Sequence, residues 1–126
     1  MTKAAALYRL FAAFGLDTYE ENSVYALETP PAFPYLTYEM KADAFGDYDT
    51  SISFSLWYRS ASWTAANAKV EEISAEIGRG GKIVPVDGGY ILVMRGSPFS
   101  QSMSDPSDDM IKRKLLNLNV RFYTND

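Results

Sequence analysis

Two short stretches of the chain carry the kinds of residues that bind ions. The first, Gly78-Arg79-Gly80-Gly81-Lys82, holds the glycines and the lysine of a phosphate-binding loop. In such a loop the glycines follow a strand and open a helix, whose first N–H groups hold the phosphate. Here they follow an expected helix and lead into an expected strand. The stretch therefore favours a helix cap and a turn over a phosphate site.

The second stretch is acidic and has carboxylate oxygens of the kind that bind hard cations. It reads Asp105-Pro106-Ser107-Asp108-Asp109. It lacks the spacing of a calcium-binding loop and the bidentate glutamate that closes one. We therefore interpret it as a turn that caps a helix, and we predict no metal site.

The chain contains no histidine and no cysteine. Without cysteine it has no disulfide, no thiolate zinc site and no cysteine nucleophile. Without histidine, its many serines lack the usual base that activates them, and nothing in the sequence selects one pair of acids for catalysis. We predict that the protein is not an enzyme and uses no cofactor. A hydrolytic or ligand-binding domain that works through carboxylates remains an alternative.

The size and charge of the chain exclude further classes of function. With 126 residues, the whole chain (1–126) is expected to form a single domain. It carries 12 Lys and Arg against 16 Asp and Glu, a formal charge of −4, which argues against capture of nucleic acid or of an anionic membrane. No apolar run approaches the ~18 residues of a membrane span. Met1 to Gly15 superficially resembles a signal peptide, but Arg9 interrupts its apolar centre, so we expect an amphipathic helix of a protein made in the cytoplasm.

Hydrophobic periodicity and turn residues divide the rest of the chain. Helices are expected over 3–14 and from Ser62 or Thr64 to Ile77, and a loop over 96–109. Strands are expected over 35–40, 51–58, 82–86, 90–95 and 112–123, and the 51–58 strand is expected to pair with its neighbours in sequence. The order α-β-β-α-β-β-β predicts an α+β fold with two layers. In it, a mostly antiparallel sheet carries both helices on one face.

Alternation within two strands predicts which side chains face the core. Ile52, Phe54, Leu56 and Tyr58 share one face of their strand, and Leu116, Leu118, Val120 and Phe122 share one face of the last. The opposite, polar side carries aromatic and arginine side chains, the types enriched at protein interfaces. The candidate interface residues are Trp57, Arg59, Trp63, Arg121 and Tyr123. The alternative is that a loop such as Pro30–Pro34 covers them within the same chain.

Several short segments along the chain resemble those of a known protein family. In order they are Pro34-Tyr35-Leu36-Thr37-Tyr38, Ile52 to Ser60, Asp87-Gly88-Gly89-Tyr90, Arg95 to Gln101, and Lys112-Arg113 before a long strand. With an N-terminal helix ahead of them, this pattern resembles the tail terminator (tail completion) proteins of long-tailed bacteriophages and prophages. The resemblance covers nearly the whole chain.

That resemblance implies a non-enzymatic neck protein of the virion, assembled in the bacterial host cytoplasm. It implies a homo-oligomeric ring, usually hexameric, which caps the tail tube protein, ends its polymerisation and presents a surface to the head-side connector protein. DNA would pass through its lumen without specific binding, and a negative lumen would repel phosphate. The candidate lumen-facing acids are Asp43, Asp47, Asp49, Asp105, Asp108 and Asp109.

Two other functions fit the same sequence. Another head–tail connector or tail tube component would have a similar sheet and helix content. From a different class, a small acidic inhibitor or immunity-type protein would bind a basic partner through its acidic helix and loops.

Overall fold

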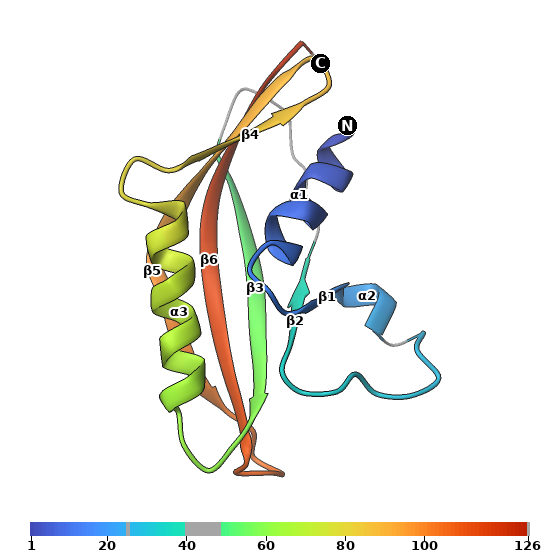
Figure 1. Ribbon diagram of the computed structural model, residues 1–126, viewed down its shortest axis with the longest axis vertical. Helices are drawn as coiled ribbons and strands as arrows, with labels where there is room; N and C mark the ends of the chain where they lie inside the picture. Colours follow the sequence, from blue (N-terminus) through green and yellow to red (C-terminus); the bar gives the residue numbers. More distant parts are fainter. Residues whose placement is uncertain (25, 40–48, 126) are drawn as a thin grey trace.

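The computed structural model describes residues 1–24, 26–39 and 49–125, and in this part of the chain it shows an α+β fold (Figure 1). Its elements, in chain order, are α1 (Lys3–Ala12), β1 (Asp17–Glu20), α2 (Glu21–Val24), β2 (Tyr35–Tyr38), β3 (Thr50–Arg59), α3 (Thr64–Ile77), β4 (Lys82–Val86), β5 (Gly89–Ser104) and β6 (Ile111–Thr124). The predicted α+β class is confirmed. The predicted order was wrong between the first helix and the first strand, because it lacked β1 and α2.

The strands form one mixed sheet in the order β1-β2-β3-β6-β5-β4. β1 runs parallel to β2, and the other neighbouring pairs are antiparallel. β3 pairs with β2, as expected from the sequence, but its other partner is β6 rather than β4. The connection through α3 carries the chain past β6 and β5 to the far edge of the sheet, where β4 lies. Pro85 cannot donate to a ladder, which predicts that its strand is an edge strand or carries a bulge, and β4 does lie at the edge of the sheet.

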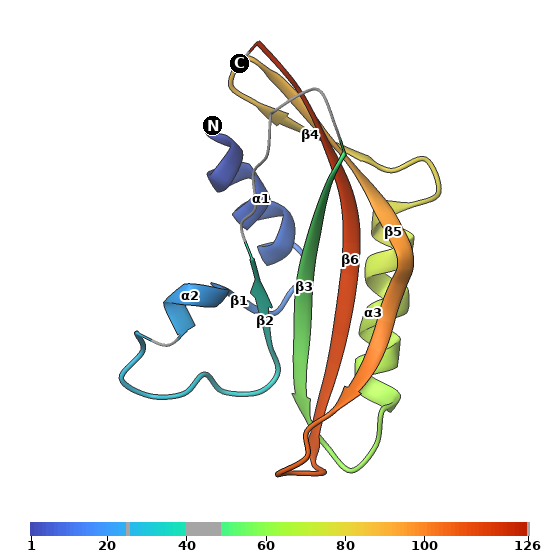
Figure 2. The same cartoon turned by 180° about the vertical axis from the view of Figure 1, so that it is seen from behind.

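The sheet curls around α1, so that the two edge strands, β1 and β4, both contact this helix (Figures 1 and 2). Phe11 lies at the centre of the contact. Its ring centroid is 4.7 Å from that of Tyr38 and 5.0 Å from that of Phe54, while Phe14 lies 5.9 Å from Phe54. Ile73 and Ile77 of α3 belong to the same buried cluster. One continuous core therefore joins both long helices to the sheet.

The predicted alternation of β3 and β6 is confirmed. Ile52, Phe54 and Leu56 are buried and Tyr58 is half-buried, and Leu116, Leu118, Val120 and Phe122 are all buried. The spacing of Ala4, Leu7, Phe11 and Phe14 predicts the buried stripe of the amphipathic helix α1, and the stripe observed differs in part. Leu10 and Ala6 are buried, whereas Ala4 is exposed, because the helix turns its Ala6–Leu10 side toward β4. α3 ends at Gly78, so the predicted helix cap is confirmed, and its φ of 75° is one that residues with a side chain rarely adopt.

The largest error of the sequence analysis concerns residues 96–109, which were expected to form a loop. β5 instead continues to Ser104 and pairs with β6 over Gly89–Arg95 and again over Ser100–Ser104. Between Arg95 and Ser100 the register shifts, and the bulged residues oppose Asn117, whose amide nitrogen donates to the Pro98 carbonyl at 3.1 Å. Gly96 permits this approach, since a Cβ there would lie 2.8 Å from the Asn117 carbonyl oxygen. Glycine, proline and serine thus mark a bulge rather than the end of a strand.

The acidic turn and the first edge strand also differ from expectation. Residues 105–109 cap no helix, because they connect the antiparallel strands β5 and β6. β1 and α2 have four residues each, and neither contains a buried residue. β1 exists because it pairs with β2, and the ring of its Tyr19 packs edge-on against Tyr35 at 6.2 Å. No periodicity of its own could have predicted it.

The first prediction concerns the contact between α1 and the sheet. Replacing Phe11, which is fully buried, with alanine removes the ring packed against Tyr38 and Phe54 and leaves a cavity. We expect the free energy of unfolding to fall by about 3–5 kcal/mol, measured by urea denaturation. Tyr8→Ala, at an exposed position of the same helix, is the matched control and is expected to change it by less than about 1 kcal/mol. Equal losses for both variants would contradict this packing.

Candidate functional site

The candidate site is the sheet face that points away from α1 and α3, called here the outer face. Figure 2 shows β3, β5 and β6 with no described helix crossing in front of them. The buried hydrophobic residues of β3 and β6 point to the core, so the alternate residues of these strands, including the buried Ser55, lie on the outer face. Registers across the sheet then place Tyr35, Trp57, Arg113, Arg121, Tyr123 and Tyr90 together on it.

At one end of the outer face Trp57 is the centre of an aromatic and arginine cluster. Its ring stacks on Tyr35 with centroids 5.9 Å apart and planes 11° apart, and the Arg113 guanidinium carbon lies 4.7 Å from its centroid. The indole N–H donates to Thr37 Oγ1 at 2.8 Å, and Arg113 Nε donates to Ser55 Oγ at 3.0 Å. These contacts fix the half-buried indole in one orientation. Such a fixed, partly solvated surface of aromatic and arginine groups is typical of interface hot spots.

Two depressions flank the Trp57 ring. One, of about 190 Å³, lies between Trp57, Tyr35 and Glu21; the other, of about 160 Å³, lies between Trp57, Met103 and Pro106. Each has room for a side chain or two rather than for a cofactor. The shape of the surface around Trp57 therefore suits contact with another protein more than binding of a small-molecule ligand.

Arg59 lies at the end of β3, exposed, and forms an ion pair with Asp108 of the β5–β6 turn. Asp108 also accepts a hydrogen bond from the Met110 N–H at 2.9 Å, and Ser60 N–H donates to the Met110 carbonyl at 2.8 Å. The turn is thereby tied to the end of β3. Arg59 is positioned by the fold beside the Trp57 cluster rather than left as a free side chain.

A second cluster lies at the other end of the outer face. Tyr90 and Tyr123 stack with centroids 5.0 Å apart, and both remain well exposed. Arg121 Nε donates to Asp49 Oδ1 at 2.7 Å. The hydrogen bond to Tyr123, and then the pairing with Asp49, raise the pKa of Arg121 further, so it is fully charged at any relevant pH. Arg121 and Tyr123 thus share one face, as predicted.

The two clusters are separated by small polar groups. Ser53 Oγ donates to Asn117 Oδ1 at 2.8 Å, between the Trp57 end and the Tyr123 end. This pair of small polar side chains lies between the two aromatic clusters. The outer face therefore offers two separate contact points.

Trp63 lies elsewhere, on the face covered by the helices. It precedes the first turn of α3, and the ammonium groups of Lys112 and Lys114 lie 5.7 and 5.2 Å from its ring centroid. Both lysines lie opposite core-facing residues of β3, so this cluster shares their side of the sheet. Lys114 is only 8% exposed and donates to Ser102 Oγ at 2.6 Å. The structure thus does not bring Trp63 together with Trp57.

The candidate lumen-facing acids fall into separate places. Asp43 and Asp47 lie outside the described residues. Asp49 precedes β3 and is paired with Arg121, whereas Asp105, Asp108 and Asp109 lie in the β5–β6 turn beyond the other end of β3. Since β3 has 10 residues at ~3.3 Å each, about 30 Å separates the two groups. A lumen lined by one group therefore would not be lined by the other.

Sequence reasoning missed Tyr35, Arg113 and Tyr90, which complete the two clusters. Arg113 was noted only beside Lys112 at the start of the last strand, and Tyr35 only as part of a strand expected to pair with the 51–58 strand. The signal that could have found them is the register, because each lies opposite a residue that was singled out: Tyr35 and Arg113 opposite Trp57, and Tyr90 opposite Tyr123. Alternation within one strand predicts which face of the sheet a side chain lies on, but not which residue of the neighbouring strand lies opposite it.

Within the described ranges no group of three or more Asp and Glu side chains lies close enough to hold a metal ion. In the same ranges, no helix is long and apolar enough to cross a membrane. Comparisons with models of protein families, with curated proteins and with solved structures find no match to this chain.

The second prediction concerns the acidic turn. Hydrogen bonds from Ser107 lower the pKa of Asp105, and the hydrogen bond from Arg59 lowers that of Asp108, both below the ordinary value of 3.8. A carboxylate whose pKa is lowered by folding stabilises the folded state above its unfolded pKa, and this contribution is lost as the pH falls through the folded pKa. We expect the urea midpoint to fall between about pH 4 and pH 2.

The matched variant is Asp105→Asn with Asp108→Asn, which removes both carboxylates and keeps their size. It is expected to be less stable than the parent near neutral pH and to lose less stability on acidification. Parallel pH profiles for parent and variant would contradict the role of these two groups.

Proposed function

We propose that the protein is a structural component of a phage tail, a tail terminator that caps the tail tube, ends its polymerisation and offers a docking surface to the head-side connector. The proposal joins the family resemblance of the sequence to one structural observation, the exposed outer face with an aromatic and arginine cluster at each end. In this proposal the protein is part of the virion neck, assembles in the host cytoplasm and performs no catalysis.

The arrangement of the layers supports the proposal. We infer a two-layer packing in which α1 and α3 cover one face of the sheet and leave the aromatic and arginine groups of the outer face partly exposed. A sheet face that no long helix covers is available to bind a partner. The pair of contact points, around Trp57 and around Tyr123, suits a part that is held between two different neighbours.

The charge of the chain agrees with a conduit for DNA. The formal charge of −4 disfavours adhesion of phosphate groups to the ring. The described acids offer two possible linings, Asp49 or the turn with Asp105, Asp108 and Asp109. We propose that one of them faces the lumen, in a ring usually of six copies as the family resemblance implies.

The third prediction tests the capping of tubes. The tail tube protein encoded in the same genome is allowed to polymerise with and without this protein, and tube lengths are measured by negative-stain electron microscopy. We expect short, uniform tubes in its presence, and lengths close to those without it when Trp57→Ala and Arg113→Ala are combined, because these side chains form one contact point.

Glu71→Ala with Glu76→Ala on the exposed side of α3 is the control and is expected to cap tubes normally. Unchanged tube lengths with the parent protein would contradict the proposal. A tight complex of the monomer with one basic protein, lost at high salt, would instead favour the inhibitor class.

A further inference from the structure

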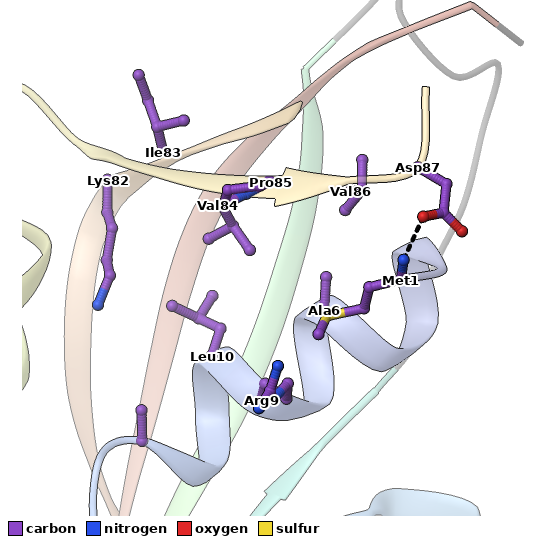
Figure 3. A pocket seen from close by; sticks show the side chains of 11 residues that line it. Met1, Ala6, Arg9, Leu10, Lys82, Ile83, Val84, Pro85, Val86 and Asp87 are labelled. Carbon is purple, nitrogen blue, oxygen red and sulfur yellow. Dashed lines mark hydrogen bonds and ion pairs between the residues drawn. The ribbon is translucent and has the colours of Figure 1, made fainter. Parts of the chain in front are cut away.

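A groove separates α1 from the edge strand β4. It has a volume of about 510 Å³, and its walls are mostly aliphatic: Ala6, Leu10 and Ala13 from the helix and Val84 and Val86 from the strand. Figure 3 shows Leu10 pointing from α1 toward β4 and Val84 pointing from β4 toward α1, with open space between them. The ion pair between the Met1 amino group and Asp87 lies at one end. The curled sheet thus leaves an apolar slot where β4 approaches α1.

Two cations border this slot without an acidic partner. Arg9 is exposed on α1, and Lys82 begins β4 and points toward the helix (Figure 3). Among the described residues neither side chain has a hydrogen bond or an ion pair, whereas Arg59, Lys69 and Arg121 are all paired. An apolar slot with two free cations at its border fits a segment that is both apolar and acidic.

The same chain carries such a segment on a different part of its surface. The arm, defined here as residues 21–24 and 26–34, projects away from the body of the molecule in both views (Figures 1 and 2). Leu27, 41% exposed, lies on it beside Glu28. From 17 to 34 the sequence contains Asp17, Glu20, Glu21 and Glu28 and no lysine or arginine. The arm is therefore acidic and carries an apolar side chain that is partly exposed in the subunit.

These two surfaces of the chain carry opposite charge. Residues 78–104, which include β4 and β5, contain three cations, Arg79, Lys82 and Arg95. They contain one acid, Asp87, which is paired with the N-terminus. Placed head to tail, the acidic arm of one copy meets the cationic border of the next. The two surfaces differ, so the contact is heterologous, and a heterologous contact closes a ring when its rotation permits.

We propose that the groove between α1 and β4 receives the arm of a second copy of this chain. Leu27 of one copy enters the apolar slot of the next, and Glu21 and Glu28 lie against Arg9 and Lys82. This inference rests on the proposed ring, because it names the contact that joins neighbouring subunits in it. It gives α2 and the proline-rich segment after it a role that the isolated subunit does not explain.

The fourth prediction uses sedimentation velocity over a range of concentrations of the full chain. The parent is expected to form an oligomer several times its mass of 14.1 kDa. The arm variant Leu27→Asp and the groove variant Arg9→Glu with Lys82→Glu are each expected to weaken association by roughly tenfold or more. Circular dichroism confirms that each variant is folded. The control, Glu71→Lys with Glu76→Lys on α3, makes an equally large charge change away from both surfaces and is expected to leave association unchanged.

Two combinations identify the pairing itself. Mixed in equal amounts, the arm variant still has a working groove and the groove variant a working arm, so we expect a complex of about twice 14.1 kDa that grows no further. Placing Glu21→Lys and Glu28→Lys in the groove variant reverses both charges, and we expect association to recover to within about threefold of the parent.

An oligomer insensitive to both the arm and the groove variants would overturn the contact, and so would a parent that stays monomeric at all concentrations. A small amphipathic anion found in the groove by native mass spectrometry, with association unaffected by Leu27→Asp, would also overturn it. If the Leu27→Asp substitution changes neither the oligomer nor tube capping, the arm–groove contact is contradicted and the terminator role is still supported. An arm–groove oligomer that has no effect on tubes would support the contact and contradict that role.

Discussion

The register between β3 and β6 is the constraint on which the rest of the structure depends. Each residue of Thr50–Arg59 lies opposite one residue of β6, without interruption, so the two strands alternate together. A slip of β3 by one residue against β6 would turn Phe54 outward and bring Trp57 into the core, away from Arg113. Burial of the aliphatic and phenyl side chains under α1 and α3 prevents such a slip. The packing that stabilises the subunit thereby also aligns the aromatic and arginine groups of the outer face.

Much of this arrangement could be predicted from the sequence, because the information is local. Alternation over Ile52–Tyr58 and Leu116–Phe122 gave the buried faces correctly, and the glycines after α3 and at Gly88–Gly89 gave the helix end and the hairpin. The fold class follows from these elements. What could not be predicted depends on partners far away in the sequence: β1 exists only through its pairing with β2, and β5 crosses its bulge only because Asn117 and β6 accompany it.

The site was predictable to the same degree. Trp57, Arg121 and Tyr123 were placed on the polar side by alternation, but Trp63 was grouped with Trp57, although Lys112 and Lys114 hold it on the opposite face. A residue beyond the end of a strand no longer follows the strand's period, so its side of the sheet depends on the helix that follows. The groove between α1 and β4 escaped notice because it arises from the curl of the sheet, which no single segment encodes.

The absence of histidine and cysteine from the sequence fits a protein whose work is done by shape and by fixed charges. Arginine and aromatic side chains hold their properties over a wide range of pH, and Arg121 is held further in its charged form by Tyr123 and Asp49. Such groups suit contacts that must form during assembly and persist afterwards. The arm and the groove would then join copies of the chain, while the outer face meets a different protein.

The outer face is the surface that we propose to bind the tail tube. Hydroxyl-radical footprinting measures this binding most directly, with the oxidation of Trp57, Tyr90 and Tyr123 side chains followed by mass spectrometry with and without tubes. Tyr8, exposed on α1, is the internal reference. We expect tubes to protect Trp57 or the Tyr90–Tyr123 pair at least several-fold while Tyr8 stays reactive. Equal oxidation of all four side chains with and without tubes would contradict this proposal.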